Sequence, residues 1–408
     1  MTRIALLPSL YPPSLGGVEE LTRHLALALV DAGDQVEVWT SQPDDAAAQT
    51  VEIRDGLVVR RLPMPLPATN WSAIRRTSTV GTRTLLSLRT AVAAFRPDVL
   101  HVQCFGPNGA YATALSRTTG VPLIVTLQGE TLMDDADIFD TSRVLRAALR
   151  RGLRQAAAVT GCSGFTLADA ETRFGLEPGR GQVIFNGVSL STPSAGGDRP
   201  ARYAPVADRP YVLALGRVVE KKGFDLLLGA FAAMATGRTA ADLVIAGEGA
   251  AGSGLQRRAE ELGLADQVHF PGRLSRDEVS SAMAGATVFV MPSRLEPFGI
   301  VVLEAWRAGV AVVATNRGGP PEFVRDGLDG VLVDPFVTAG FAAALEGLLL
   351  EPDRRRAIAA CGRQRVAEFG WPIIAERYRS IYASVTGSGG APVDDAAALA
   401  RSHPGKAS

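Results

Sequence analysis

Lysine, histidine, cysteine and aromatic residues are scarce in this chain of 408 residues. It has three lysines, four histidines and three cysteines, and aromatic residues make up 6% of it. The cysteines, Cys104, Cys162 and Cys361, are odd in number and far apart, which argues against a disulfide framework or a zinc site. We expect three buried thiols, no bound metal and no cofactor.

Net charge and long apolar runs are also missing. Forty-two basic residues balance 42 acidic ones and are dispersed along the chain, so the basic footprint of a nucleic-acid-binding protein is absent. No apolar run approaches the roughly eighteen residues of a membrane span, and the first run, IALLP, is too short for a signal peptide. The sequence therefore predicts a cytoplasmic protein with no nucleic-acid partner.

Short apolar runs alternate with helical stretches throughout the chain. Runs such as QVEVWT, DVLHVQ, YVLALG, TVFVMP and VAVVAT have the length of buried strands, and their spacing is typical of doubly wound parallel sheets. The chain is longer than a usual single domain. These features predict an α/β fold with two domains, each built around its own parallel sheet.

The best domain boundary lies between Val188 and Tyr211, where periodicity is lost and Pro, Gly and Ser accumulate. After Thr386 the chain is rich in Gly, Ala and Ser without a core pattern, which predicts a disordered tail. We expect an N-terminal domain over 1–190, a linker over 191–210, a C-terminal domain over 211–369, a last helix over 370–386 and a tail over 387–408.

Two glutamates eight residues apart, Glu296 and Glu304, flank a Pro-Phe-Gly-Ile turn. Pro297 suits the first turn of a helix, so we expect a helix over 298–308. Eight residues of helix span roughly 12 Å, which is too far for a retaining glycosidase pair at about 5.5 Å. These glutamates are therefore better suited to binding hydroxyl groups.

The start of this expected helix offers a seat for an anion such as a diphosphate. Backbone N–H groups of Phe298, Gly299 and Ile300 would lack intrahelical partners, and the helix dipole adds positive potential there. A second glycine loop, Gly318 to Glu322, ends the strand VAVVAT and could shape the same pocket.

Two further loops follow strands. Gly16 and Gly17 come after IALLP and open a helix that closes at Gly33, at the edge where open α/β sheets bind ligands. Arg217 and Lys222 follow the strand YVLAL, and two cations there could neutralise a diphosphate leaving group. Lysine is rare in this arginine-dominated chain, which makes Lys222 more informative than a lysine usually is.

Together, GGVE at 16–19, GRVVEKKG at 216–223 and the glutamate pair make the chain resemble the retaining glycosyltransferases of family 4, which have the GT-B fold. The resemblance covers nearly the whole length. It implies two Rossmann-like domains facing a central cleft, the first on the acceptor side and the second binding the nucleotide sugar. It also implies that the helix over 370–386 crosses back onto the first domain.

The resemblance assigns roles to individual residues. Arg217 and Lys222 would hold the donor phosphates, Glu296 would bind the transferred sugar and Glu304 the ribose. Family resemblance also implies that the loop at Gly16 and Gly17 approaches the diphosphate and the sugar. The turn at Gly272 and Arg273 would lie beside the base.

One position departs from the family pattern. Gln128, in the turn after the strand in VTLQGET, stands where family members often have histidine. A glutamine can hydrogen-bond a sugar hydroxyl but cannot carry a proton, so an acid–base role is not expected at this position.

The expected reaction is transfer of a hexosyl group, with retention and without a metal, from a nucleotide-diphosphate sugar to a hydroxyl acceptor. UDP-linked donors such as UDP-GlcNAc or UDP-glucose are favoured, and the acceptor is a small polar molecule or a glycolipid. A nucleotide-sugar epimerase on the same fold is one alternative, although four histidines hardly supply its acid–base groups. An NAD-dependent oxidoreductase is another, resting on the GxGxxG at Gly247, Gly249 and Gly252, which we interpret as a turn.

Charged residues gather between Asp134 and Arg154. Asp134, Asp135, Asp137 and Asp140 could receive an amine-bearing acceptor, whereas the following arginines, with Val144, Leu145, Leu149 and Leu153, could dock on anionic lipid. Charge runs are more often solvated faces, so neither hypothesis is favoured, and peripheral membrane contact remains only possible.

Overall fold

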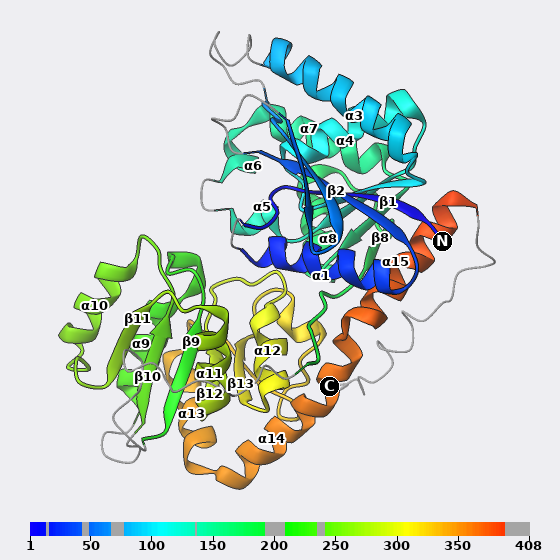
Figure 1. Cartoon of the computed structure of the whole chain (residues 1–408). Coiled ribbons are helices and arrows are strands. Elements are labelled where there is room, and N and C mark those ends of the chain that lie inside the picture. Colours follow the sequence, from blue (N-terminus) through cyan, green and yellow to red (C-terminus); the bar gives the residue numbers. More distant parts are fainter. Residues whose placement is uncertain are drawn as a thin grey trace.

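The computed structural model describes residues 1–13, 16–42, 49–66, 77–134, 137–191, 209–234 and 241–387. The strands of this part form two separate sheets, and helices cover both faces of each (Figure 1). This confirms the α/β prediction, because each sheet is doubly wound and almost entirely parallel.

The first sheet has the order β3-β4-β2-β1-β5-β6-β7-β8, and only β3 and β4 pair antiparallel. Its inner strands are buried on both sides, which explains why they are continuous apolar runs. The strands are β1 (Arg3–Pro8), β2 (Gln35–Ser41), β3 (Thr50–Arg54), β4 (Leu57–Leu62), β5 (Val99–Gln103), β6 (Leu123–Leu127), β7 (Ala158–Gly161) and β8 (Gly181–Val183).

Two groups of helices cover the first sheet. One face packs against α3 (Thr82–Phe95), α4 (Pro107–Thr119), α7 (Arg143–Gln155) and α8 (Gly164–Phe174). The other packs against α1 (Gly17–Asp31) and α15 (Trp371–Thr386). The helix α15 thus returns from the end of the chain to lie along α1 (Figure 1). The short helices α5 (Glu130–Met133) and α6 (Ile138–Thr141) lie between β6 and α7.

The second sheet has the order β11-β10-β9-β12-β13-β14 and is parallel throughout its described strands. They are β9 (Tyr211–Leu215), β10 (Asp242–Ala246), β11 (Val268–Gly272), β12 (Val288–Met291), β13 (Ala311–Thr315) and β14 (Val331–Val333). The helices around it are α9 (Phe224–Ala233), α10 (Gly252–Glu261), α11 (Arg276–Gly285), α12 (Ile300–Ala308), α13 (Thr338–Leu350) and α14 (Pro352–Arg365).

The expected domain ranges can be compared with the strands of the two sheets, whereas most of the expected linker and tail cannot. The strands of the first sheet span 3–183 and those of the second span 211–333. Most of the expected linker, 192–208, and nearly all of the expected tail, 388–408, lie outside the described residues. Of the three cysteines, Cys162 is buried as expected, whereas Cys104 and Cys361 keep partial exposure, so the prediction of three buried thiols is wrong for two.

Candidate active site

The loops that leave the carboxyl ends of the second sheet hold one another in place. The Gly216 amide donates to the Ala246 carbonyl, and the Gly247 amide donates to the Gly272 carbonyl. A Cβ on Gly249 would lie 2.3 Å from the Val218 carbonyl oxygen. Gly247 and Gly249 of the GxGxxG therefore allow two loops to touch, in agreement with our interpretation of this segment as a turn. We call these loops, together with those after β12 and β13, the second rim.

The partly exposed Lys222 and the buried Glu296 form a charged pair in the second rim. Lys222 Nζ lies 2.7 Å from Glu296 Oε2, and the Ser293 hydroxyl donates to the same oxygen at 2.7 Å. The Glu296 residue is only 6% exposed. Because an unpaired buried carboxylate is costly, the contacts with the lysine and the serine compensate its burial and fix its orientation. The structure thus brings together two residues that the sequence analysis assigned to the site.

The backbone of Glu296 is tied to the loop after β13. Its amide donates to the Arg317 carbonyl, and its carbonyl accepts from the Gly319 amide. A Cβ on Gly318 would lie 2.1 Å from the Glu296 carbonyl oxygen, and its φ is +112°. Only glycine suits that conformation and that close approach. The Gly318 to Glu322 loop thus positions Glu296.

The helix after Glu296 begins later than the sequence predicts. α12 starts at Ile300, with Gly299 as its N-cap at φ +92°, so Pro297 does not occupy the first turn. Phe298 is buried, and its ring stacks on Phe323 with centroids 4.6 Å apart. Burial of the Phe298 ring in the core outweighs extension of the helix back to this residue. Of the three residues proposed for the anion seat, only Ile300 lies within the helix, and the Phe298 side chain belongs to the core.

Glu304 lies about one turn inside α12 and is half-buried. Burial raises the pKa of its carboxyl above the usual range, while Arg307 acts in the opposite direction. Gly272, at the end of β11, has φ +75° and open space where a Cβ would project, apart from a Glu248 carboxyl oxygen at 4.0 Å. Arg273 follows it and is exposed.

Arg217 and Lys221 reach across to the first half of the chain. The exposed Arg217 donates from Nη2 to the Met133 carbonyl at 3.1 Å. Lys221 Nζ donates to the carbonyls of Leu132 and Asp134 and to Asp137 Oδ1, at 3.3, 2.6 and 2.9 Å. Sequence reasoning chose Lys222 and missed Lys221, although the rarity of lysine applied to both. The two neighbouring lysines therefore face different halves of the molecule.

The loops at the carboxyl ends of the first sheet, the first rim, include Gln128. Its side-chain amide donates to Gln103 Oε1 at 3.1 Å, and its carbonyl oxygen accepts from Asn186 Nδ2 at 2.9 Å. Gln103 Nε2 lies 3.2 Å from the buried His101 ring, whose other nitrogen contacts Tyr382 OH of α15. Burial lowers the pKa of His101 to about 3. Gln128 is therefore held at both ends of its amide by a buried polar chain.

Glu130 is the titratable group of the first rim that sequence reasoning missed. Its two carboxyl oxygens accept the amides of Phe105 at 2.6 Å and Gln128 at 2.7 Å. Burial raises the pKa of this carboxyl to about 7, Asp169 adds to the rise, and the backbone N–H groups oppose it. Its position directly after Gly129, in the turn that follows β6, was the available signal.

At the start of α1, Gly16 is the N-cap, in an extended conformation, and Gly17 is the first helical residue, as predicted. A Cβ on Gly16 would meet the Glu19 carboxyl, so a larger residue there would displace the Glu19 side chain from the helix N-terminus. Residues 14 and 15 lie outside the described part of the chain.

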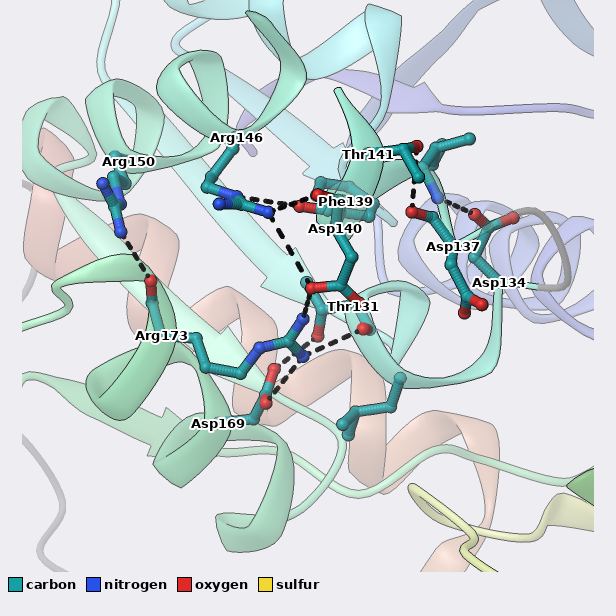
Figure 2. A network of polar contacts seen from close by, with 12 residues as sticks. Thr131, Asp134, Asp137, Phe139, Asp140, Thr141, Arg146, Arg150, Asp169 and Arg173 are labelled. Atoms are coloured by element: carbon teal, nitrogen blue, oxygen red, sulfur yellow. Dashed lines mark hydrogen bonds and ion pairs between the residues drawn. The ribbon is translucent and has the colours of Figure 1, made fainter. Parts of the chain in front are cut away.

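The acidic cluster of the first rim is occupied by protein partners (Figure 2). Asp134 accepts the Ile138 amide at 2.6 Å, and Asp140 pairs with Arg173, which also binds Asp169 and the Thr131 carbonyl. Asp135 lies outside the described residues. These contacts leave little support for an amine-binding role of the described acids.

The lipid-docking hypothesis needs a related correction. Leu145, Leu149 and Leu153 are 0–3% exposed and pack into the core of the first sheet, so they cannot enter a lipid surface. Arg146 and Arg150 bind backbone carbonyls of Phe139, Asp140 and Arg173 (Figure 2). Only Val144 of the four apolar residues is exposed.

Several contacts join the two halves beside Glu296. The Ser163 hydroxyl donates to the Pro297 carbonyl at 2.6 Å, and a Cβ on Gly129 would lie 2.3 Å from the Pro297 ring. Glu322 accepts the Gly164 and Phe165 amides of α8 at 2.6 and 2.7 Å. The first and second rims are therefore in direct contact around Pro297.

Among the described residues, no group of three His, Cys, Asp or Glu side chains could hold a metal ion. A search of the same residues finds no helix long and apolar enough to cross a membrane.

Comparison with known proteins agrees with this geometry. Residues 16–187 match the model of the glycosyl transferase 4-like domain, and residues 199–365 match that of the glycosyl transferases group 1. D-inositol 3-phosphate glycosyltransferase 1 of Catenulispora acidiphila is 30% identical over 397 residues, which cover 92% of this chain and 93% of that protein. The chain belongs to the family 4 glycosyltransferases.

A further relative and two solved structures show how far the resemblance extends. The GDP-mannose-dependent alpha-(1-6)-phosphatidylinositol monomannoside mannosyltransferase of Mycobacterium tuberculosis is 28% identical over 396 residues, covering 92% of this chain and 97% of that one. Sucrose-phosphate synthase of Thermosynechococcus elongatus has the same GT-B fold, with a TM-score of 0.77, 24% identity and coverage of 95% and 100%. Anabaena HepE, solved with UDP, reaches a TM-score of 0.71 at 20% identity, covering 94% of this chain and all of that one.

Proposed function

We propose that this glycosyltransferase moves a hexosyl group from a UDP-linked sugar to a hydroxyl of a small polar or glycolipid acceptor, with retention and without a metal. The observation that carries the proposal is the Lys222–Glu296 pair of the second rim, in which the carboxylate is buried. It holds a cation and a hydroxyl-binding carboxylate within one hydrogen bond of each other, next to the N-terminus of α12.

The departing diphosphate would be stabilised by positive charge on three sides. Arg217 and Lys222 supply two cations, and the first turn of α12 supplies backbone N–H groups and a helix dipole. Preorganised positive charge aimed at a developing anion is the largest catalytic contribution that side chains offer. Lys222 would exchange part of its contact with Glu296 for the donor phosphate.

Glu296 would bind hydroxyls of the transferred sugar and orient its anomeric carbon. The bond from this carbon to the diphosphate oxygen breaks, and the bond to the acceptor oxygen forms on the same face. The proton of the acceptor hydroxyl passes to an oxygen of the leaving diphosphate. Glu304 would accept hydrogen bonds from the ribose hydroxyls, and Gly272 and Arg273 would contact the base.

Contacts between the two rims support a closed arrangement during transfer. Ser163 and Gly129 touch Pro297, the residue next to Glu296, so closure of the two halves would bring the acceptor side onto the catalytic carboxylate. Closure also excludes water, which limits hydrolysis of the donor.

Calorimetric titration with UDP, GDP, ADP and reduced nicotinamide dinucleotide, with a chelator present, tests the proposal. We expect selective UDP binding that survives chelation and is lost in Lys222→Ala. The relative named for GDP-mannose makes GDP the essential comparison. Preference for GDP would overturn the UDP assignment alone, whereas nicotinamide binding would overturn the transferase site. Conversion of a UDP-sugar without any acceptor would favour an epimerase.

A further inference from the structure

Three neighbouring helices of the first half carry arginine and no acid. The helices α3, α4 and α7 contain eight arginines and neither aspartate nor glutamate, in a chain whose total charge is balanced. α4 contacts both α3 and α7, and the three lie together on one face of the first sheet, at the top of Figure 1 and away from the second sheet. The surface of these three helices therefore carries an excess of positive charge.

Six of these arginines are exposed and lack a carboxylate partner among the described residues. We call them the arginine face; its members are Arg83, Arg89, Arg117, Arg143, Arg151 and Arg154. Leu88 of α3 and Leu149 of α7 are fully buried against the sheet, so the arginines project from the opposite sides of their helices. Structural roles account for Arg146 and Arg150, but not for these six.

A shallow hollow lies inside the arginine face, between α4 and α7. Its volume is about 200 Å³, and Arg117 and Arg151 line it together with Thr113 and three alanines. The small side chains leave room for a group of phosphate size between two guanidinium groups. Arginine binds phosphate through paired N–H groups, so the hollow has the shape and chemistry of an anion seat.

We propose that the arginine face docks on an anionic membrane surface, with a lipid phosphate seated between Arg117 and Arg151. Helices of 13 or 14 residues are about 20 Å long and pack 8–10 Å apart, so the face spans several headgroups. Exposed Leu86 and Val144 lie on the same helices and add apolar contact. The contact is electrostatic and peripheral. It uses the exposed arginines, unlike the docking mode expected from the sequence, which relied on leucines that the structure buries.

Sedimentation with vesicles of known composition tests the proposal. We expect binding to vesicles containing roughly one-third phosphatidylglycerol, little binding to pure phosphatidylcholine, and release on raising the salt concentration. Arg117→Gln/Arg151→Gln should weaken binding roughly tenfold to thirtyfold, since each arginine near such a surface contributes about a fivefold factor. Neither side chain hydrogen-bonds or ion-pairs with another described residue, and unchanged thermal unfolding would establish that the variant is folded.

Arg257→Gln/Arg258→Gln on α10 is the matched control, because it removes the same charge from exposed positions of the other half. We expect it to bind vesicles as the unaltered protein does. Equal loss in both variants, or no preference for anionic vesicles, would overturn the proposal. Single-stranded RNA that displaced the protein from vesicles at equal phosphate concentration would overturn the assignment to a membrane and favour nucleic acid.

Discussion

The two rims handle polar groups differently. On the first rim, Gln128 is engaged at both ends of its amide, and Arg173 connects two carboxylates and a carbonyl. On the second rim, the lysine–glutamate pair is surrounded by glycine loops and a helix N-terminus. The first rim is a closed network of protein partners, whereas the second combines cations and backbone amides in the pattern that suits a phosphate.

This contrast fits the chemistry proposed for each rim. A diphosphate brings its own charge, so the second rim must supply cations that can change partners when the donor arrives. A neutral hydroxyl acceptor needs orientation rather than charge, which a rigid first rim can provide. Changing residues on either rim should therefore affect different kinetic parameters.

Replacing the second-rim carboxylate should have the largest effect. Glu296→Gln keeps the shape but removes the negative charge held by Lys222 and Ser293. We expect kcat to fall roughly a hundredfold, with the donor Kd changed less than about threefold, because the lost interaction is made chiefly in the transition state. Steady-state kinetics and calorimetry with the donor measure the two quantities.

Glu304→Gln is the matched control for that split, since it lies on the same helix and is assigned to ribose. It should weaken donor binding more than it lowers kcat. Equal losses of kcat and donor affinity in Glu296→Gln would contradict the role given to Glu296.

The first rim should respond to pH through Glu130. Its pKa of about 7 lies above the usual 4.5, so this carboxyl stabilises the fold most below pH 4.5, and the contribution is lost as the pH rises through 7. The loss should reach about 1–2 kcal/mol, less than the full shift implies because the residue is partly exposed. Chemical denaturation between pH 5 and 8 measures it.

Glu130→Gln provides the comparison, because its amide stays neutral at every pH. The stability difference between the two proteins should shrink or reverse as the pH rises. Parallel pH profiles for the two proteins would show that this carboxyl is not the titrating group.

Replacing Lys221, which reaches from the second rim to the first half, should have an intermediate effect. Lys221→Met removes three contacts to the segment from Leu132 to Asp137 while leaving Lys222 in place. We expect the acceptor KM to rise about fivefold with the donor Kd unchanged, since the partly exposed Lys221–Asp137 ion pair contributes on the order of 1 kcal/mol. The matched Lys222→Met should instead weaken donor binding.

A double-mutant cycle with Asp137→Asn tests whether the lysine acts through this acid. Coupling is expected between Lys221 and Asp137 and not between Lys222 and Asp137. Additive effects of Lys221→Met and Asp137→Asn would show that Lys221 does not act through Asp137.

Local sequence patterns were sufficient to predict much of the second rim. Glycines after short apolar strands predict close loops, the rarity of lysine points to Lys222, and the glutamate pair points to Glu296, which lies 2.7 Å from Lys222. The start of α12 was predicted two residues early, because a rule for proline in helices could not anticipate that Phe298 packs against Phe323. Burial of a large ring outweighs local helix propensity.

Contacts between distant segments were beyond the sequence. Lys221 and Lys222 are adjacent and chemically identical, yet Lys221 contacts Asp137 of the first half and Lys222 contacts Glu296 of the second half. Likewise, the partners of Gln128 lie 25 and 58 residues away. Periodicity reports which face of an element is buried, but it carries no information on such pairings.

The smallest predicted effect concerns Glu322, which joins the second rim to α8 of the first half. Its carboxylate accepts two backbone amides at the start of that helix, an arrangement favoured by the helix dipole. In Glu322→Gln the amide nitrogen faces a donor, so one of the two bonds is lost and the closed arrangement is weakened. Because the contact is exposed, we expect only a two- to threefold rise in KM for donor and acceptor together.

Small-angle scattering supplies a readout for closure itself. The radius of gyration of Glu322→Gln should increase slightly without ligand and return to the original value with saturating UDP. Glu351→Gln removes the same charge from a pair within the second half, with Arg354, and should change neither quantity. A Glu322→Gln protein that matched this control in both scattering and kinetics would show that the α8 contact does not hold the two rims together.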